Sequence, residues 1–315
     1  MKTVEFLLWS NCPNNCRFCW QRLFHDKTTW LNEEEKLQSI KDCSEMIKEE
    51  GGPNDLLLVG GEVFNSHEKS VNDSLKSLYH QIVTYIKKDK VRFLYANTNL
   101  TYSDRTNLVN LLDAFEGLED RLKFTTSYDL DGRFNRLNEA EMQALEAGKQ
   151  CKPLNREELF LDNLKFIDEN YPKINTVVNT IVTKAVYEAV SKDDDYDLFW
   201  LMKKYPNTVV WVNLIPYIPV KGYEGLDVRY SQTLKVLERA NELMPGYLLS
   251  YTENFDENQD KELYEYHKDG GFVERTAGML PCGHNENFKL VNRADECFIC
   301  KLKEYCKDNF DRLSQ

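Results

Sequence analysis

Residues 9–20 read WSNCPNNCRFCW. The three cysteines of this stretch, Cys12, Cys16 and Cys19, have the spacing C-x3-C-x2-C and directly follow the apolar run 4–9. We expect that run to be the first strand and the cysteines to lie on a tight loop, because proline and asparagine favour turns. Three thiolates can ligate three irons of a four-iron cluster, which leaves the fourth iron open to a substrate or a second cofactor. The same thiols could instead form half of a zinc site, or three unconnected buried side chains.

The aromatic residue Phe18 stands just before the last of these cysteines, and with it the motif resembles the cluster motif of the radical S-adenosylmethionine (radical SAM) enzymes. The resemblance implies that S-adenosylmethionine chelates the open iron through its amino and carboxylate groups. It implies further that an electron from the cluster cleaves the sulfonium, and that the resulting 5'-deoxyadenosyl radical abstracts hydrogen from a substrate. Cys12, Cys16 and Cys19 are then the catalytic metal ligands, and Phe18 contacts the cofactor.

The length and composition of the chain indicate a globular α/β protein. A chain of 315 residues is long enough for one α/β barrel with a small appendage. The formal charge of -12 and the pI near 5.1 argue against a protein that grips nucleic acid by neutralising phosphates. Because the N-terminus has no apolar signal region and no apolar run approaches the roughly 20 residues of a membrane helix, we expect a soluble, cytoplasmic protein. Its nine cysteines are then reduced, which favours metal ligation over disulfides.

Six apolar or β-branched runs alternate with helical segments along the chain. The expected strands are residues 4–9, 55–59, 91–96, 122–126, 174–182 and 209–215. The expected helices are residues 32–51, 70–88, 104–115, 155–170 and 231–244, with shorter ones at 138–147 and through 199–200. This pattern predicts a parallel sheet, and six pairs make an incomplete (β/α)6 TIM-like barrel over residues 1–245. Such a barrel carries its chemistry at the C-terminal ends of its strands.

The second expected strand ends in Gly60, Gly61 and Glu62. Two glycines at a strand end leave the backbone uncovered, so that a ligand can approach it closely. Alone, this triplet is a common turn. Its place, one helix after the cysteine loop, resembles that of the GGE motif of the radical SAM family. The resemblance implies that the triplet binds the methionyl amino group of the cofactor.

The ends of the next three strands match the family in part. Asn97-Thr98-Asn99 stands where a T-N-G triplet is usual, but the glycine is missing after Asn99. Ser127 stands where a serine commonly contacts the methionyl carboxylate or the ribose. Asn179 is a polar residue in an otherwise apolar strand, so its side chain needs a hydrogen-bond partner. By the resemblance that partner is the cofactor ribose, and by the residues alone it can equally be another group of the protein.

A long polar connection, residues 130–154, follows the fourth strand and is a candidate lid or substrate loop. Arg133 within this connection can anchor a carboxylate or a phosphate, or it can be a solvated surface side chain. Cys151 near its end is either a hydrogen donor or a spare thiol.

Four further cysteines near the C-terminus have the spacing C-x14-C-x2-C-x5-C: Cys282, Cys297, Cys300 and Cys306. Four thiolates complete a zinc site or a closed iron-sulfur cluster, and the spacing alone does not choose between these. The run resembles the auxiliary-cluster extensions called SPASM and twitch domains, although Asn309 stands where a further cysteine is expected. The resemblance implies one fully ligated second [4Fe-4S] cluster in a twitch-like region, residues 246–315, which transfers electrons or stabilises a small domain.

Together these features predict a radical SAM enzyme that binds S-adenosylmethionine and two [4Fe-4S] clusters. The resemblance implies a flavodoxin-type or ferredoxin-type electron donor and a small-molecule or peptide substrate, and it leaves open whether the enzyme is an oxidoreductase, a lyase or a transferase. Two alternatives stay open: the same chemistry on a nucleic-acid base, and a non-enzymatic electron-transfer or metal-binding protein. A pure electron carrier normally closes the coordination shell of its cluster, so the three-cysteine site favours the enzyme.

Overall fold

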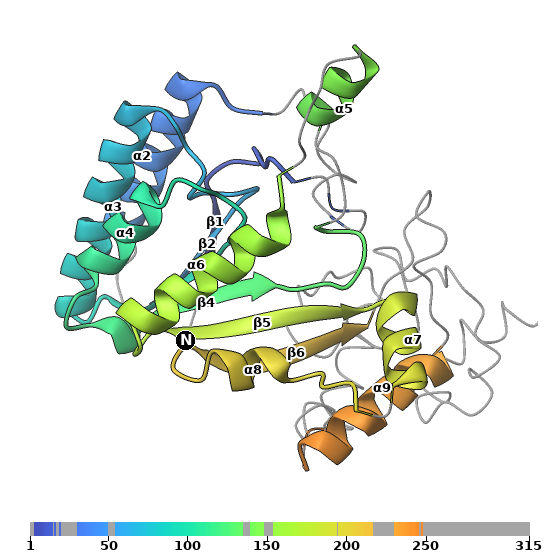
Figure 1. Ribbon diagram of the computed structural model, residues 1–315. Coiled ribbons are helices and arrows are strands. Elements are labelled where there is room, and N and C mark those ends of the chain that lie inside the picture. The colour runs from blue at the N-terminus through green and yellow to red at the C-terminus, as the bar shows by residue number, and fades with distance from the viewer. Residues whose placement is uncertain are drawn as a thin grey trace, which may run out of the picture. The chain divides into compact units, whose positions relative to one another are not determined.

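The computed structural model describes residues 3–14, 16, 19, 30–49, 54–134, 139–147, 154–193, 195–216, 230–245 and 247 (Figure 1). Several predictions lie outside the described residues: the contact of Phe18 with the cofactor, the role of Cys151, and the second cluster at Cys282, Cys297, Cys300 and Cys306. The twitch-like region also lies outside them, apart from Tyr247, and its boundary stays a prediction.

One six-stranded sheet organises the described part of the chain. Its strands are β1 (Thr3–Leu7), β2 (Asn54–Val59), β3 (Val91–Asn97), β4 (Leu122–Ser127), β5 (Asn175–Val182) and β6 (Val209–Pro216). They lie in the order β1 to β6, and each neighbouring pair from β1–β2 to β4–β5 is parallel. The predicted parallel α/β sheet, with a strand in each of the six expected places, is therefore confirmed.

Helices separate the strands, as the sequence predicts. They are α2 (Glu33–Glu49), α3 (Lys69–Lys87), α4 (Thr106–Ala114), α5 (Glu139–Glu146), α6 (Arg156–Asn170), α7 (Lys184–Lys192), α8 (Trp200–Lys204) and α9 (Tyr230–Leu243), with a short 3-10 helix, η2 (Glu119–Arg121). The start of α2 is a capping box, because Glu35 N–H donates to Asn32 Oδ1 at 3.1 Å and Asn32 N–H donates to Glu35 Oε2 at 2.8 Å. Of these helices, α7 was not expected from the sequence.

The strand order explains where the polar strand ends meet. Successive parallel strands with right-handed crossovers place all their C-terminal ends along one edge of the sheet. Figure 1 shows α2, α3 and α4 grouped together, and α3 packs between the other two. One row of the sheet, Leu58, Ala96 and Phe124, is paired in register and buried. Burying such a side chain contributes about 1.5–3 kcal/mol for a leucine or phenylalanine.

The chain divides into two compact units, one of residues 1–179 with 200–213 and the other of residues 180–199 with 214–315. All of the site described below lies in the first unit. In the second unit, α7 packs against α9, and Tyr247 Oη accepts a hydrogen bond from Leu214 N–H at 2.8 Å.

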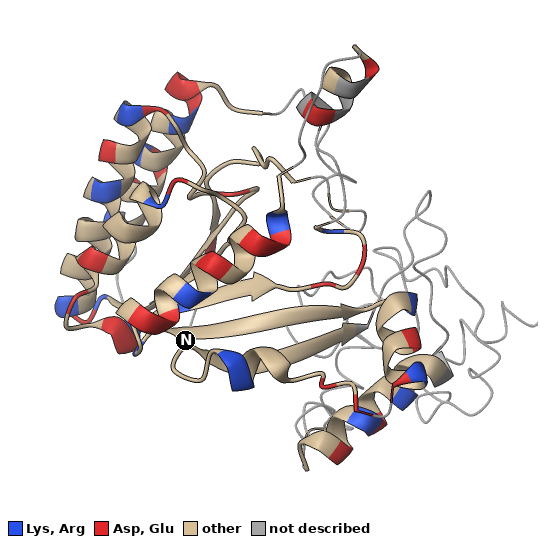
Figure 2. Cartoon of the chain, in the orientation of Figure 1, with Lys and Arg blue, Asp and Glu red and all other residues tan. Residues whose placement is uncertain are grey.

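Charged side chains of both signs are interspersed along the helices of the first unit, as Figure 2 shows for α2, α3 and α6. Such a mixed surface differs from the basic stripe of a protein that binds nucleic acid through its phosphates. Among the described residues, the structure has no helix that is both long enough and apolar enough to span a bilayer.

Candidate functional site

The cysteine loop and the Gly-Gly-Glu triplet lie directly against each other at the C-terminal edge of β1 and β2. Leu8 N–H donates to Val59 O at 3.0 Å, which extends the strand pairing beyond β1. Gly61 N–H then donates to Trp9 O at 2.8 Å, and Glu62 N–H donates to Asn11 O at 2.9 Å. Two motifs about fifty residues apart in the sequence are thus joined by backbone hydrogen bonds.

The close approach of the cysteine-loop backbone requires a glycine at position 61. A Cβ atom at Gly61 would lie 2.2 Å from Asn11 O and 2.4 Å from Ser10 O, and one at Gly60 would lie 2.8 Å from Trp9 O. The two glycines predict the close approach of a ligand, and the structure shows that the backbone of the cysteine loop approaches them. The role of Gly60, Gly61 and Glu62 toward the methionyl group stays a prediction.

The Glu62 carboxylate is buried, with 1% of the residue exposed. It accepts hydrogen bonds from Asn99 N–H at 2.6 Å, from Thr98 Oγ1 at 3.0 Å and from Phe64 N–H at 3.2 Å. Burial raises the pKa of Glu62 to about 7, and these hydrogen bonds, with the charge of Arg133, limit the rise. Glu62 therefore connects the end of β2 to the loop that follows β3.

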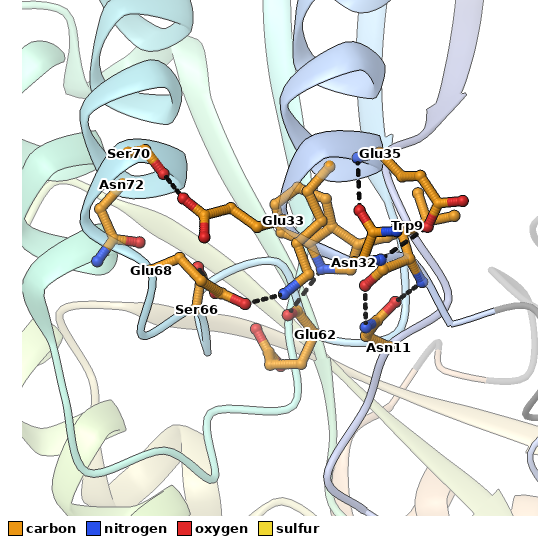
Figure 3. A network of polar contacts seen from close by, with 12 residues as sticks. Trp9, Asn11, Asn32, Glu33, Glu35, Glu62, Ser66, Glu68, Ser70 and Asn72 are labelled. Carbon is orange, nitrogen blue, oxygen red and sulfur yellow. Dashed lines mark hydrogen bonds and ion pairs between the residues drawn. The ribbon is translucent and has the colours of Figure 1, made fainter.

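A second set of contacts anchors the cysteine loop to the start of α2 (Figure 3). Two hydrogen bonds join the Asn11 side chain to the backbone of Leu31. Asn11 Nδ2 donates to Leu31 O at 2.9 Å, and Leu31 N–H donates to Asn11 Oδ1 at 2.8 Å. Lys36 Nζ pairs with Glu68 Oε1 at 2.8 Å, and Ser66 Oγ donates to Glu68 Oε2 at 2.7 Å. The hydrogen bonds from Lys36 and Ser66 lower the pKa of Glu68 to about 2.

The three thiols of the loop differ in exposure. Cys16 is buried, whereas Cys12 and Cys19 are partly exposed. Asn99 Nδ2 donates to Cys12 Sγ at an N–S distance of 3.5 Å. Burial, and then the negative charge of Cys16, raises the pKa of the Cys12 thiol above its usual range. A coordinated metal would remove this cost, because it deprotonates the thiol that binds it.

Within the described ranges, no three His, Cys, Asp or Glu side chains form a group that could hold a metal ion. In a four-iron cluster each thiolate binds a different iron, so the three sulfur atoms need not all lie within reach of one metal ion. The ligation of a cluster by Cys12, Cys16 and Cys19 stays a prediction.

Arg133 is a largely buried cation that interacts electrostatically with Cys16 and Cys19. Its Nε donates to Asp129 Oδ2 at 2.6 Å, and the two side chains are 11% and 0% exposed. Burial acts to lower the pKa of Arg133, but the negative charges of Cys16 and Asp129 outweigh it, and the net pKa lies above its usual range. Arg133 is therefore a charged, partnered side chain of the site, and the alternative of a solvated surface arginine is wrong.

The loop after β3 is held in an unusual conformation. Leu100 has a φ of +54°, which lies in the left-handed region that favours glycine. This conformation costs a leucine about 1–2 kcal/mol, which the complete burial of its side chain offsets. Asn163 of α6, itself fully buried, donates through Nδ2 to Leu100 O at 2.9 Å and to Tyr102 O at 2.8 Å.

A row of partly exposed polar side chains crosses β4, β5 and β6 at the level where β4 ends. Ser127 is paired in register with Asn179, and Asn213 Nδ2 donates to Asn179 Oδ1 at 3.3 Å. We call Ser127, Asn179 and Asn213 the polar row. Asn97, at the end of β3, is also partly exposed. Asn213 was not predicted from the sequence, although it shows the same signal as Asn179, an asparagine within an apolar strand.

Comparisons with known proteins complete the description of the site. No family model matches the sequence, and no curated protein matches it significantly. Among solved structures, a polyhistidine-tagged anSMEcpe with bound AdoMet is 17% identical, covers 97% of this chain and 85% of its own, and has a TM-score of 0.44. A sugar phosphate isomerase/epimerase from Parabacteroides distasonis is 12% identical, with coverages of 77% and 88% and a TM-score of 0.29. Because both TM-scores are below 0.5, we infer the function from the residues of the site alone.

Proposed function

We propose that this chain is a radical SAM enzyme built on an incomplete (β/α)6 TIM-like barrel. The observation that carries the proposal is the direct backbone pairing of the C-x3-C-x2-C loop with the Gly-Gly-Glu triplet at the C-terminal edge of the sheet. A short sequence motif can arise by chance. Chance is a much weaker explanation for two motifs that are expected to act on one cofactor and that also meet at one edge of the sheet. The sequential order β1 to β6 supports the barrel, since a doubly wound sheet would reverse its order.

In this proposal Cys12, Cys16 and Cys19 hold a [4Fe-4S] cluster. When bound, the cluster supplies the single electron that cleaves S-adenosylmethionine into methionine and a 5'-deoxyadenosyl radical, which abstracts hydrogen from the substrate. Burial of Cys16 and of Glu62 excludes water from part of the site. The largely buried Arg133 contributes a positive charge that acts on Cys16 and Cys19.

The remaining residues of the edge would bind the second cofactor. Gly60, Gly61 and Glu62 would orient the methionyl part of the cofactor. Asn97, Ser127 and Asn179 would contact its carboxylate and ribose, and Phe18 would contact the adenine. Support comes from the partial exposure of Asn97 and the polar row, because a side chain that binds a ligand must be accessible to it. A hydrogen bond from Asn213 fixes the Asn179 amide in place.

We further propose that Cys282, Cys297, Cys300 and Cys306 hold an auxiliary [4Fe-4S] cluster, with zinc as the alternative metal. A small-molecule or peptide substrate suits a chain of net charge -12 better than a nucleic acid does. A flavodoxin-type or ferredoxin-type protein would supply the electron.

The test is anaerobic reconstitution of the full chain with iron and sulfide, followed by dithionite reduction in the presence of S-adenosylmethionine. We expect 5'-deoxyadenosine from the wild type and none from a variant with Cys12, Cys16 and Cys19 all changed to alanine. That variant should retain about four irons at the auxiliary site. Absence of 5'-deoxyadenosine from an iron-loaded wild type would refute the enzyme, and zinc in the triple variant would refute the auxiliary cluster.

A further inference from the structure

Asn99, in the loop after β3, touches both motifs of the site. Its backbone N–H donates to Glu62 Oε2 at 2.6 Å, and its side-chain Nδ2 donates to Cys12 Sγ at 3.5 Å. The residue is only 6% exposed, so little solvent competes for these contacts. Asn99 is therefore placed to act on the cysteine loop from a neighbouring strand end.

The orientation of the Asn99 amide is determined by its other contacts. Oδ1 accepts hydrogen bonds from Thr101 N–H and from Thr101 Oγ1, both at 2.8 Å. A backbone N–H can only donate, so the oxygen of the amide must face Thr101. The NH2 group must then face Cys12, and a flipped amide would lose its contacts on both sides.

The loop that carries Asn99 is itself fixed from a distance. Leu100 is buried in its left-handed conformation, and Asn163 holds the carbonyls of Leu100 and Tyr102. Arg105 Nε in turn donates to Asn163 Oδ1 at 2.6 Å. These contacts hold the donor opposite the sulfur before any metal binds, which is the preorganisation that a tuning group requires.

We propose that Asn99 is a positioning residue that donates a hydrogen bond to the Cys12 thiolate and thereby raises the reduction potential of the cluster which that thiolate ligates. The inference rests on the proposed function, because it needs a cluster at Cys12. Reduction adds negative charge to the cluster and its sulfur ligands, and a donated N–H group stabilises the more negative state more strongly. Asn99 thus acts at Cys12, while the charge of Arg133 acts at Cys16 and Cys19.

The experiment is a redox titration of the reconstituted full chain, followed by electron paramagnetic resonance. The variants are Asn99→Ala, which removes the donor, and Asn99→Asp, which keeps an acceptor for Thr101 but replaces the donor with a negative charge. The matched control is Asn107→Ala, because Asn107 is also a buried asparagine but donates to Asn72 Oδ1 and Phe64 O. The signal of the variant that lacks Cys12, Cys16 and Cys19 is subtracted to remove any auxiliary cluster.

We expect the midpoint potential to shift downward in Asn99→Ala, to shift further downward in Asn99→Asp, and to stay at the wild-type value in Asn107→Ala. Equal potentials in the wild type and Asn99→Ala would overturn the proposal. Loss of the cluster from both Asn99 variants, with retention in Asn107→Ala, would also overturn it and leave Asn99 a purely structural role. A wild type that assembles no cluster at Cys12 would instead refute the proposed function, so the two failures are distinguishable.

Discussion

The two halves of the sheet edge are built differently. At the ends of β1, β2 and β3, the N–H groups of Gly61, Glu62 and Asn99 donate to acceptors within the protein, and the Glu62 carboxylate is buried. Across β4, β5 and β6, at the level where β4 ends, the polar row is partly exposed, and the amides of Asn179 and Asn213 meet at the longer distance of 3.3 Å. The first half is assembled in advance, as a metal site requires, while the second keeps its polar groups accessible to a ligand. Changes in the first half should therefore affect folding and cluster loading, and changes in the second half should affect binding.

The largest effect is expected from Gly61→Ala. The new methyl group would lie 2.2 Å from Asn11 O and must separate the cysteine loop from the triplet. We expect a loss of unfolding free energy of about 3 kcal/mol, together with loss of most of the iron bound at Cys12, Cys16 and Cys19. Urea unfolding and iron analysis measure the two effects.

Gly117→Ala is the matched control for this substitution. Gly117 has a φ of +76° and no atom within 4 Å of its Cβ position, so only backbone strain of about 1 kcal/mol is expected. Equal losses of stability in the two variants would show that Gly61 is not required by the approach of the loop.

The buried Glu62 should make stability depend on pH. Its folded-state pKa of about 7 lies above the ordinary value of 4.5, so the folded state binds this proton more tightly than the unfolded state does. Protonated Glu62 makes its full contribution to the free energy of unfolding below about pH 4.5. This contribution, about 3 kcal/mol, is lost as the pH rises through 7. Urea unfolding of the wild type and of Glu62→Gln from pH 5 to 8 should show a smaller decline in the variant. Parallel curves would contradict a raised pKa.

The polar row should contribute to binding more than to folding. Asn179→Ala removes one long, partly exposed hydrogen bond, so we expect a stability change below about 1 kcal/mol. Under the proposed function it also removes a contact to S-adenosylmethionine, worth roughly a tenfold increase in Kd. Anaerobic calorimetry measures the Kd, and an unchanged Kd would exclude Asn179 from the cofactor site.

The smallest effect is expected at the pair of the buried Lys36 and the partly exposed Glu68, which lies beside the first half. The pKa of Glu68, about 2, lies below its ordinary value, so the pair stabilises the fold above about pH 4.5 and the contribution is lost as the pH falls toward 2. Because Glu68 is 32% exposed, solvent screening limits this contribution to below about 1 kcal/mol. Glu68→Gln should therefore lower the urea midpoint slightly at pH 7 and not at all near pH 2. A variant as stable as the wild type at pH 7 would show that the pair contributes nothing.

Much of the sheet could be predicted because its strands are encoded locally. The β-branched run 174–182 and the apolar run 55–59 allow few other structures, and both strands end within one residue of the expected positions. The helix α7 was missed because nine residues give too little periodicity to separate a short helix from a connection.

The site was harder to predict, because its contacts depend on tertiary structure. The sequence shows that something approaches Gly61 but cannot show whether it is a ligand or the chain itself. Likewise, the missing glycine at Leu100 was a departure from the family motif, and only the burial of its side chain explains how a leucine holds that conformation. The ion pair between the largely buried Arg133 and the buried Asp129 had no sequence signal beyond the two charges.

The central claim is that the cysteine loop and the Gly-Gly-Glu triplet form one site in which S-adenosylmethionine is cleaved. The most direct test is the rate of 5'-deoxyadenosine formation by wild type, Gly117→Ala and Gly61→Ala, expressed per cluster bound at Cys12, Cys16 and Cys19. We expect Gly117→Ala to match the wild type and Gly61→Ala to be slower by roughly 100-fold, the cost of misplacing reacting groups by about 1 Å. An unchanged rate per cluster in Gly61→Ala, or no 5'-deoxyadenosine from the loaded wild type, would contradict the claim.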